Sequence, residues 1–133
     1  MPEGVGYGPQ FTASTGLTLN YIGKHCYASS GIVSVDDTET FMLDFKTGKG
    51  YIVCKIQFNL PAITADDYLY QVYFNGTVVQ SYNSQEALGT GSKPSTVIRL
   101  IIPPLTHVQC SADNVADSSP NDNIVALIGR VYE

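Results

Sequence analysis

Apolar and polar residues alternate along most of the chain after residue 18, with the two-residue period of β-strands. The clearest segment runs from Tyr51 to Leu60, where the even-numbered residues are apolar and share one face while the odd-numbered residues share the other. Pro61 ends this segment because proline has no amide hydrogen for a sheet ladder. Nowhere does an i, i+3, i+4, i+7 spacing persist for the length of an ordinary helix. The pattern therefore predicts an all-β protein.

The same alternation marks further strands. Residues 41–46 alternate in this way, and the short Thr47–Gly50 segment with its two glycines predicts that they form a hairpin with residues 51–60. A strand over 124–132 is apolar on both faces, as expected of a central strand or of one whose outer face meets a partner. The remaining predicted strands are one or two over 21–35, broken near Ser29-Ser30-Gly31, one over 96–102 that stops at Pro103-Pro104, and one over 106–112 with Val108, Cys110 and Ala112 inward.

The sharpest local signal is the Asn75-Gly76 pair between two strands that span residues 67–74 and 77–82. This dipeptide suits the positive φ angles of a type I′ hairpin turn. The resulting register places Leu69 opposite Tyr82, Gln71 opposite Gln80 and Tyr73 opposite Val78 on one side, and Phe74, Val72 and Tyr70 opposite Thr77, Val79 and Ser81 on the other. Because both sides carry apolar groups, the hairpin is the first candidate for a surface between subunits.

About seven or eight strands joined by hairpins and by two polar loops, over 83–95 and 113–122, predict a two-sheet antiparallel sandwich of jelly-roll type. The length of 133 residues suits a single domain, which we assign to residues 19–133. Residues 1–18 are punctuated by glycine and proline and are predicted to form an extended arm. Its Val5, Tyr7 and Phe11 are apolar for a tail, so they are expected either to dock on a neighbouring subunit or to pack on the chain's own core.

Composition narrows the classes of function. Charged residues make up 14% of the chain, against about 25% in a typical soluble domain, which favours a surface covered by neighbours. The net charge of -5 and the absence of a basic stretch argue against nucleic-acid binding. No apolar run reaches the roughly 18 to 20 residues of a membrane helix, and no signal peptide is recognisable, so we expect a protein made and kept soluble in a cytosol. The odd number of cysteines, Cys26, Cys54 and Cys110, fits reduced core thiols better than disulfides.

Candidates for catalysis or metal binding are few. The carboxylate pairs Asp36-Asp37 and Asp66-Asp67 lie at predicted turns, where solvated caps explain them, and the two histidines lie in no recognisable motif. A calcium site is the other interpretation of these acids, or of the oxygen-rich group Asp113, Asn114, Asp117, Asn121 and Asp122, although the spacing matches no EF-hand. We therefore expect no enzyme activity, no cofactor and no resident metal.

Tyrosine is abundant, with nine residues, and tryptophan is absent. Exposed tyrosines stack on sugar rings, which makes Tyr68, Tyr70, Tyr73 and Tyr82 candidates for a glycan-binding platform. Tyrosine is equally typical of protein interfaces and of packing between strands. The absence of tryptophan favours the interface interpretation.

Three segments together resemble small jelly-roll virion proteins of tailed bacteriophages and related viruses. They are SVDDTETFMLDFKTGKGYIVCKIQF from Ser34 to Phe58, DYLYQVYFNGTVV from Asp67 to Val79, and IIPPLTHVQCSADNV from Ile101 to Val115. The resemblance lies in general character and contains no diagnostic motif. It implies a homotrimer that decorates or cements a capsid, or a fibre, spike or tail component.

The leading hypothesis is therefore a structural virion protein, made in the host cytoplasm, that contacts itself and other virion proteins. Its predicted interface comprises Val5, Tyr7, Phe11, Leu69, Tyr73, Val78 and Tyr82. The alternative is a carbohydrate-binding module or lectin-like sandwich, for which the partner is a glycan. A small cupin-like metalloenzyme is the last hypothesis, because two isolated histidines do not supply its ligand cluster.

Overall fold

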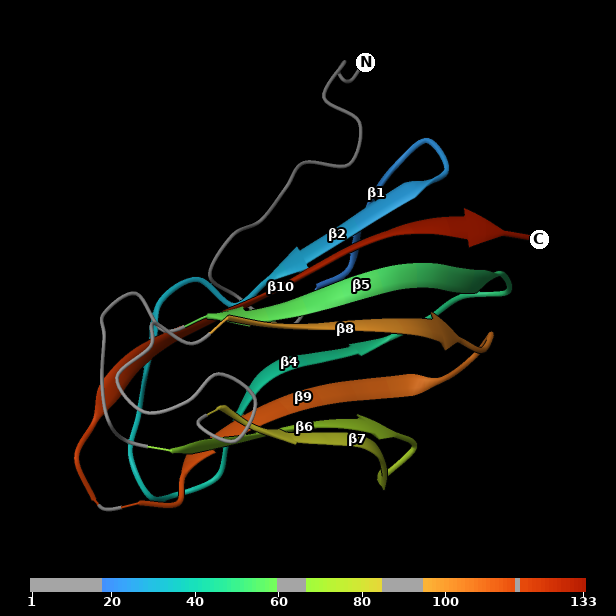
Figure 1. Ribbon diagram of the computed structural model, residues 1–133. Helices are drawn as coiled ribbons and strands as arrows, with labels where there is room; N and C mark the ends of the chain where they lie inside the picture. Colours follow the sequence, from blue (N-terminus) through green and yellow to red (C-terminus); the bar gives the residue numbers. More distant parts are fainter. Residues whose placement is uncertain (1–17, 60–66, 85–94, 117) are drawn as a thin grey trace.

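The computed structural model describes residues 18–59, 67–84, 95–116 and 118–133, which form ten strands in two antiparallel sheets (Figure 1). Sheet formation follows the alternation in the sequence, since every second residue of the long strands turns inward and is buried. The strands are β1 (Asn20–Ile22), β2 (His25–Ser29), β3 (Val33–Val35), β4 (Thr40–Lys46), β5 (Tyr51–Asn59), β6 (Tyr68–Phe74), β7 (Thr77–Asn83), β8 (Ser95–Ile102), β9 (His107–Asn114) and β10 (Asn121–Tyr132).

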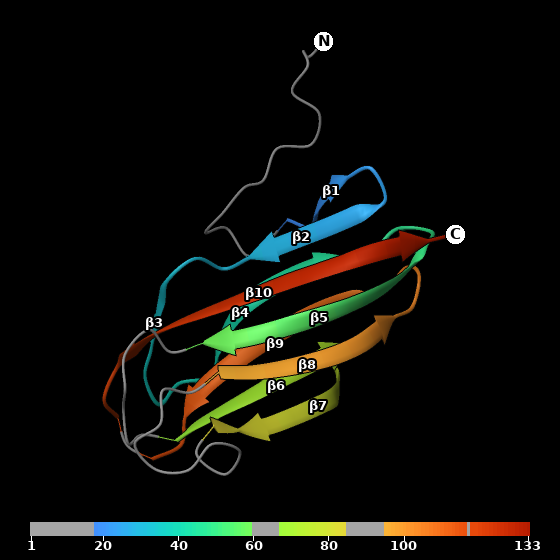
Figure 2. The same ribbon diagram turned by 45° about the horizontal axis from the view of Figure 1, so that its top comes forward.

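The strand order makes the molecule a jelly-roll sandwich. One sheet has the order β1-β2-β10-β5-β8, with β3 paired to the first part of β10, and the other has the order β4-β9-β6-β7. Four strands of the first sheet, β2-β10-β5-β8, thus lie against the four strands of the second (Figure 2). Two four-stranded antiparallel layers wound in this way are the jelly-roll arrangement. The predicted fold class is confirmed.

Aromatic side chains tie the two sheets together at the core. The Tyr70 ring of β6 stacks on the Phe58 ring of β5 with centroids 4.5 Å apart, and its hydroxyl donates a hydrogen bond of 2.8 Å to Oδ1 of Asn123 on β10. The Tyr68 hydroxyl donates to the Val35 carbonyl at 2.8 Å. Both tyrosines are fully buried. The rest of the core comprises mainly aliphatic residues and all three cysteines, among them Cys26, Leu43, Ile52, Cys54, Ile56, Val72, Ile98, Val108, Cys110, Val125 and Leu127.

The hairpin predicted from residues 41–46 and 51–60 is wrong. β4 pairs with β9 in one sheet, and β5 pairs with β10 and β8 in the other. The connection crosses between the sheets because its polar groups bond to the β8–β9 turn: the Thr47 hydroxyl donates to the Pro103 carbonyl at 3.0 Å, and the Leu105 amide donates to the Gly48 carbonyl at 2.8 Å. Both strands can therefore face the same core from opposite sides.

The Asn75-Gly76 hairpin between β6 and β7 is confirmed, with φ of 51° at Asn75 and 83° at Gly76. Its predicted register is correct only next to the turn, where Phe74 pairs with Thr77 and Tyr73 with Val78. An irregularity between Val72 and Tyr73 then places one extra β7 residue in the pairing, as in a β-bulge. Beyond it every pair shifts by one residue, so that Tyr82 lies opposite Tyr70 and Leu69 lies opposite Asn83.

The other predicted strands are confirmed as β8, β9 and β10, and β10 is a central strand between β2 and β5. The strand count exceeds the predicted seven or eight because residues 20–35 form three short strands. The break expected near Ser29-Ser30-Gly31 lies between β2 and β3. The arm assigned to residues 1–18 lies outside the described residues except for Thr18.

Candidate functional site

The outer face of the β1-β2-β10-β5-β8 sheet carries large apolar side chains that remain exposed. Val53 is 43% exposed, Ile101 63% and Ile128 48%. They come from three adjacent strands, since β5 lies between β10 and β8. In the register of these strands, Val53 lies opposite Ile101 on β8 and opposite Arg130 on β10. A mostly apolar surface of this kind is unusual on a protein that remains alone in water.

Three cations lie among these apolar side chains. Lys55 is directly opposite both Arg99 on β8 and Ile128 on β10, and Arg130 lies one row away. Within the described part of the chain, none of the three forms an ion pair. We refer to this surface as the basic apolar face, which comprises Val53, Lys55, Val97, Arg99, Ile101, Ile128 and Arg130.

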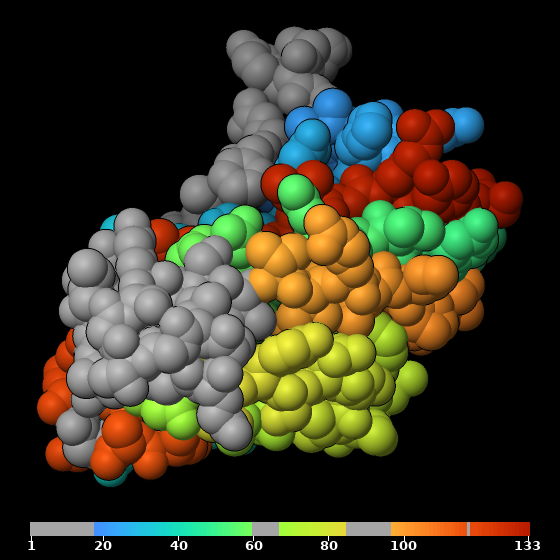
Figure 3. All heavy atoms as spheres, viewed as in Figure 1, coloured from blue at the N-terminus to red at the C-terminus, as the bar shows by residue number. Residues whose placement is uncertain are grey.

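The basic apolar face is hollowed at its centre. A shallow depression of about 470 Å³ is lined by side chains of this face and by Cys54 and Leu100. On one side the basic apolar face ends at β8, the last strand of its sheet. The edge of β8 lies beside β7 of the other sheet (Figure 3). A partner can therefore reach both the depression and the strand edge.

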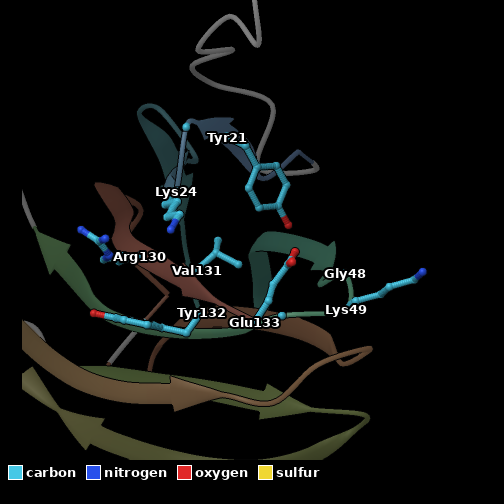
Figure 4. Close-up of a pocket in the computed structure, with 10 residues that line it drawn as sticks. Tyr21, Lys24, Gly48, Lys49, Arg130, Val131, Tyr132 and Glu133 are labelled. Carbon is cyan, nitrogen blue, oxygen red and sulfur yellow. The ribbon is translucent and has the colours of Figure 1, made fainter.

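A second pocket, of about 580 Å³, adjoins this face at the end of β10. Figure 4 shows Lys24 and Arg130 on one side of it and the Lys49 side chain pointing away. On the other side the Tyr21 hydroxyl and the Glu133 carboxylate point toward each other. The Tyr132 ring stacks on Tyr51 with centroids 5.4 Å apart and lies 5.6 Å from the Arg130 guanidinium carbon. The pocket thus mixes both signs of charge with aromatic surface.

The outer face of the β4-β9-β6-β7 sheet has a different chemistry. The Phe41 and Tyr73 rings contact each other at a centroid distance of 5.5 Å, and Phe41 is exposed. The Glu39 carboxylate accepts hydrogen bonds from the Tyr73 hydroxyl at 2.5 Å and from the Ser111 hydroxyl at 2.7 Å. Further along the same face, Asp44 contacts His107 Nε2 at 2.6 Å.

Acidic groups gather at one end of this second face. Partial burial raises the pKa of the Asp113 carboxyl above its ordinary value, and the negative charges of Glu39, Asp37 and Asp36 raise it further. The hydrogen bond to Glu39 likewise raises the pKa of Tyr73. We refer to Asp36, Asp37, Glu39 and Asp113, with the neighbouring rings of Phe41 and Tyr73, as the acidic face.

The residues predicted as an interface are only partly brought together. Leu69 and Tyr73 are half-buried and lie on the outer side of β6, and the exposed Val78 lies opposite Tyr73. Tyr82 is exposed, but it pairs with the inward-facing Tyr70. The bulge therefore removes it from the side of Leu69 and Tyr73, where it was predicted. Val5, Tyr7 and Phe11 lie outside the described residues.

The sequence interpretation missed the basic apolar face, although a signal was present. Val53 on β5 and Val97 and Ile101 on β8 are apolar at positions that the alternation assigns to the outside. Their significance depends on β5 and β8 being neighbours, which the sequence pattern does not reveal.

The tyrosine platform expected for glycan binding is only partly available. Tyr68 and Tyr70 are fully buried, so their assignment to an exposed platform is wrong. They are buried because β6 turns these positions toward Phe58 and the opposite sheet. Tyr73 and Tyr82 retain exposed surface.

All three thiols are buried, as predicted for reduced core cysteines. Burial raises the pKa of Cys26 to about 11 and that of Cys54 to about 12, and the pKa of Cys110 is raised for the same reason. Thiols of this kind are poor nucleophiles, because the thiolate is the reactive form. Among the described residues, no three His, Cys, Asp or Glu side chains form a group able to hold a metal ion. No helix in the described ranges has the length and apolar character to cross a membrane.

No protein-family model and no curated protein matches this sequence. Solved structures do resemble its fold. The infectious bursal disease virus VP2 subviral particle aligns with a TM-score of 0.50 and 10% identity, over 82% of this chain and 33% of the VP2 chain. A family 35 carbohydrate-binding module from Clostridium thermocellum aligns with a TM-score of 0.43 and 10% identity, over 73% of this chain and 97% of the module. The chain thus spans about a third of VP2, and at this identity the likeness shows the shared fold alone.

Proposed function

We propose that this chain is a structural protein of a virus particle that works through protein–protein contacts, as an oligomeric capsid decoration, cement or fibre-type component. The observation that carries the proposal is the basic apolar face. Its apolar side chains lie on three adjacent strands of one sheet, where they are exposed to water on an isolated copy. Large exposed apolar patches typically mark surfaces that a partner covers.

Covering this face stabilises a contact by removing apolar surface from water. Full burial of a Val or Ile side chain contributes about 1.5–3 kcal/mol, and about half of each side chain is still available on Val53, Ile101 and Ile128. Each therefore supplies about 1 kcal/mol. Association costs several kcal/mol because the two copies lose translational and rotational freedom. The contact therefore has to extend to neighbouring side chains. The exposed apolar residues beside these three are Val97, Tyr51 and Tyr132.

The virion part of the proposal rests on different support. The chain resembles small jelly-roll virion proteins in the three segments described above, and its fold is like that of a chain of the VP2 subviral particle. A jelly roll with low charge and an exposed apolar face suits a protein that is held among copies of itself or other particle components. We include in this proposal that the protein is located in the virion and that it is a trimer.

Light scattering coupled to size-exclusion chromatography tests the contact face. The wild-type chain is expected to form oligomers at micromolar concentration. Ile101→Glu places a charge at the most exposed apolar position of the face and is expected to yield monomers. The matched control is Ile32→Glu, at an exposed residue between β2 and β3 and outside this face, which should leave the oligomers unchanged. A wild-type monomer at all concentrations, with no binding to the purified particle, would overturn the proposal.

Glycan binding is a second candidate, favoured by the exposed Phe41 ring beside Tyr73 and by the polar groups around them. Gln71 accepts a hydrogen bond from Tyr73 at 3.1 Å, so an aromatic surface with adjacent amide groups is available. A glycan array tests it: binding by the wild type that is lost in Phe41→Ala supports it. An array with no bound glycan contradicts it.

A further inference from the structure

We infer that the basic apolar face of one copy docks on the acidic face of a second copy, so that the chain assembles head to tail. This inference rests on the proposed function and specifies its contact. The basic apolar face is the docking surface. The acidic face on the opposite side of the same molecule carries the complementary charge, so a second copy of the chain is the partner that fits it.

The cations on the basic apolar face repel one another in an isolated copy. Lys55 and Arg99 are a directly opposed pair on adjacent strands, and like charges in that relation destabilise a sheet. Arg130 lies on the next row and adds to the same positive potential. An acidic partner relieves this repulsion while its apolar surface covers Val53 and Ile101.

The acidic face offers both properties. Asp36, Asp37 and Glu39 are exposed, and their negative charges lie close enough to Asp113 to add to the effect of burial in raising the pKa of its carboxyl. Among the described residues, none of these acids forms an ion pair with a cation. The exposed Phe41 ring beside them supplies apolar surface. Among the described residues, the basic apolar face therefore carries unpaired positive charge and the acidic face carries unpaired negative charge, so the two faces are complementary.

The positions of the two faces determine the type of assembly. They lie on the outer sides of opposite sheets, so one copy can contact two neighbours at the same time. A twofold contact of the basic apolar face with itself would bring Lys55 and Arg99 of both copies together, which opposes that arrangement. A contact between unlike faces forms a closed ring, such as a trimer, if the rotation closes, and an open filament if it does not.

Two variants test the contact, each measured by sedimentation velocity over a range of concentrations. Arg99→Glu changes the basic apolar face. Asp37→Lys combined with Glu39→Gln changes the acidic face, and glutamine can still accept the hydrogen bonds from Tyr73 and Ser111. Each variant alone is expected to associate at least about tenfold more weakly than the wild type. The control Lys49→Glu reverses an exposed charge in the connection between β4 and β5, outside both faces, and should associate normally. Circular dichroism verifies that each variant folds.

Mixing the two variants is the decisive step. The intact acidic face of the Arg99→Glu chain meets the intact basic apolar face of the other, so association is expected to return. If the acidic-face variant alone assembles like the wild type, or if mixing restores nothing, head-to-tail docking is wrong while the proposed function stands. If the wild type never associates, the proposed function also fails. A monomer that binds sugars on a glycan array identifies a glycan as the occupant and overturns the inference.

Discussion

Lys55 and Arg99 lie directly opposite each other on β5 and β8, and both side chains are exposed on the same side of the sheet. Nothing in the core requires this pair, because the neighbouring inward residues Cys54, Ile56 and Ile98 supply the buried surface of these strands. Like charges opposed in this way lower the stability of a sheet. The pair is explained if the surface functions in contact with an acidic partner.

Replacing Arg99 with threonine is therefore expected to stabilise the isolated domain while weakening its association. The substitution removes the repulsion of Lys55 and introduces a β-branched residue on a strand. We expect the free energy of unfolding to rise by about 0.2–1 kcal/mol. Urea unfolding at a concentration where the chain is monomeric measures it. A clear loss of stability would show that Arg99 supports the fold.

Gly129 is expected to be intolerant of any side chain. A Cβ at this position would lie 2.7 Å from Cys54 Cβ and 2.8 Å from Ile52 Cγ2, inside the packed core. Gly129→Ala should therefore destabilise the domain by about 1–3 kcal/mol. Gly48→Ala is the control, because a Cβ there meets nothing within 4 Å. Equal midpoints for the two variants in denaturant unfolding would contradict the packing described here.

Tyr70→Phe tests the polar link between the sheets. Removing the hydroxyl leaves Oδ1 of the buried Asn123 without this donor, and an unsatisfied buried acceptor costs about 1–3 kcal/mol. Tyr73→Phe removes a hydroxyl from the outer face, where water can replace the bond to Glu39, and should cost less than about 0.5 kcal/mol. Differential scanning calorimetry compares the two. A larger effect for Tyr73 than for Tyr70 would be inconsistent with the buried hydrogen bond.

The buried thiols predict how stability depends on alkaline pH. The pKa of Cys54 in the folded protein is raised from 9.0 to about 12, so its contribution is fully present below pH 9.0 and is lost as the pH rises toward 12. Each such thiol lowers the free energy of unfolding by up to about 1.4 kcal/mol per pH unit in this window. Cys54→Ala should show a shallower decline than the wild type above pH 9.0. Parallel declines would contradict the burial of this thiol.

Much of the fold is visible in the sequence because it depends on local patterns. The alternation of Tyr51–Asn59 predicts β5, its buried face and the buried Cys54. The Asn75-Gly76 pair predicts the β6–β7 turn because few residues adopt its positive φ angles. Proline marks the end of β8 at Pro103.

The errors arise where distant segments decide the structure. The Thr47–Gly50 connection is short enough for a hairpin, but β4 pairs with β9, which follows more than sixty residues later. The bulge in β7 shifts Tyr82 without any glycine or proline that would indicate it. The basic apolar face forms only because β10, β5 and β8 are neighbours, so its residues come from separated parts of the chain.

Photo-crosslinking from position 101 tests directly whether the basic apolar face is the surface through which this protein assembles. A benzophenone amino acid in place of Ile101 should capture a second copy at micromolar concentration, and mass spectrometry should map the crosslinks to the acidic face around Phe41 and Tyr73. The same group in place of Ile32 should capture far less. If position 101 crosslinks to a second copy no more than position 32 does, the basic apolar face is not the surface through which this protein assembles.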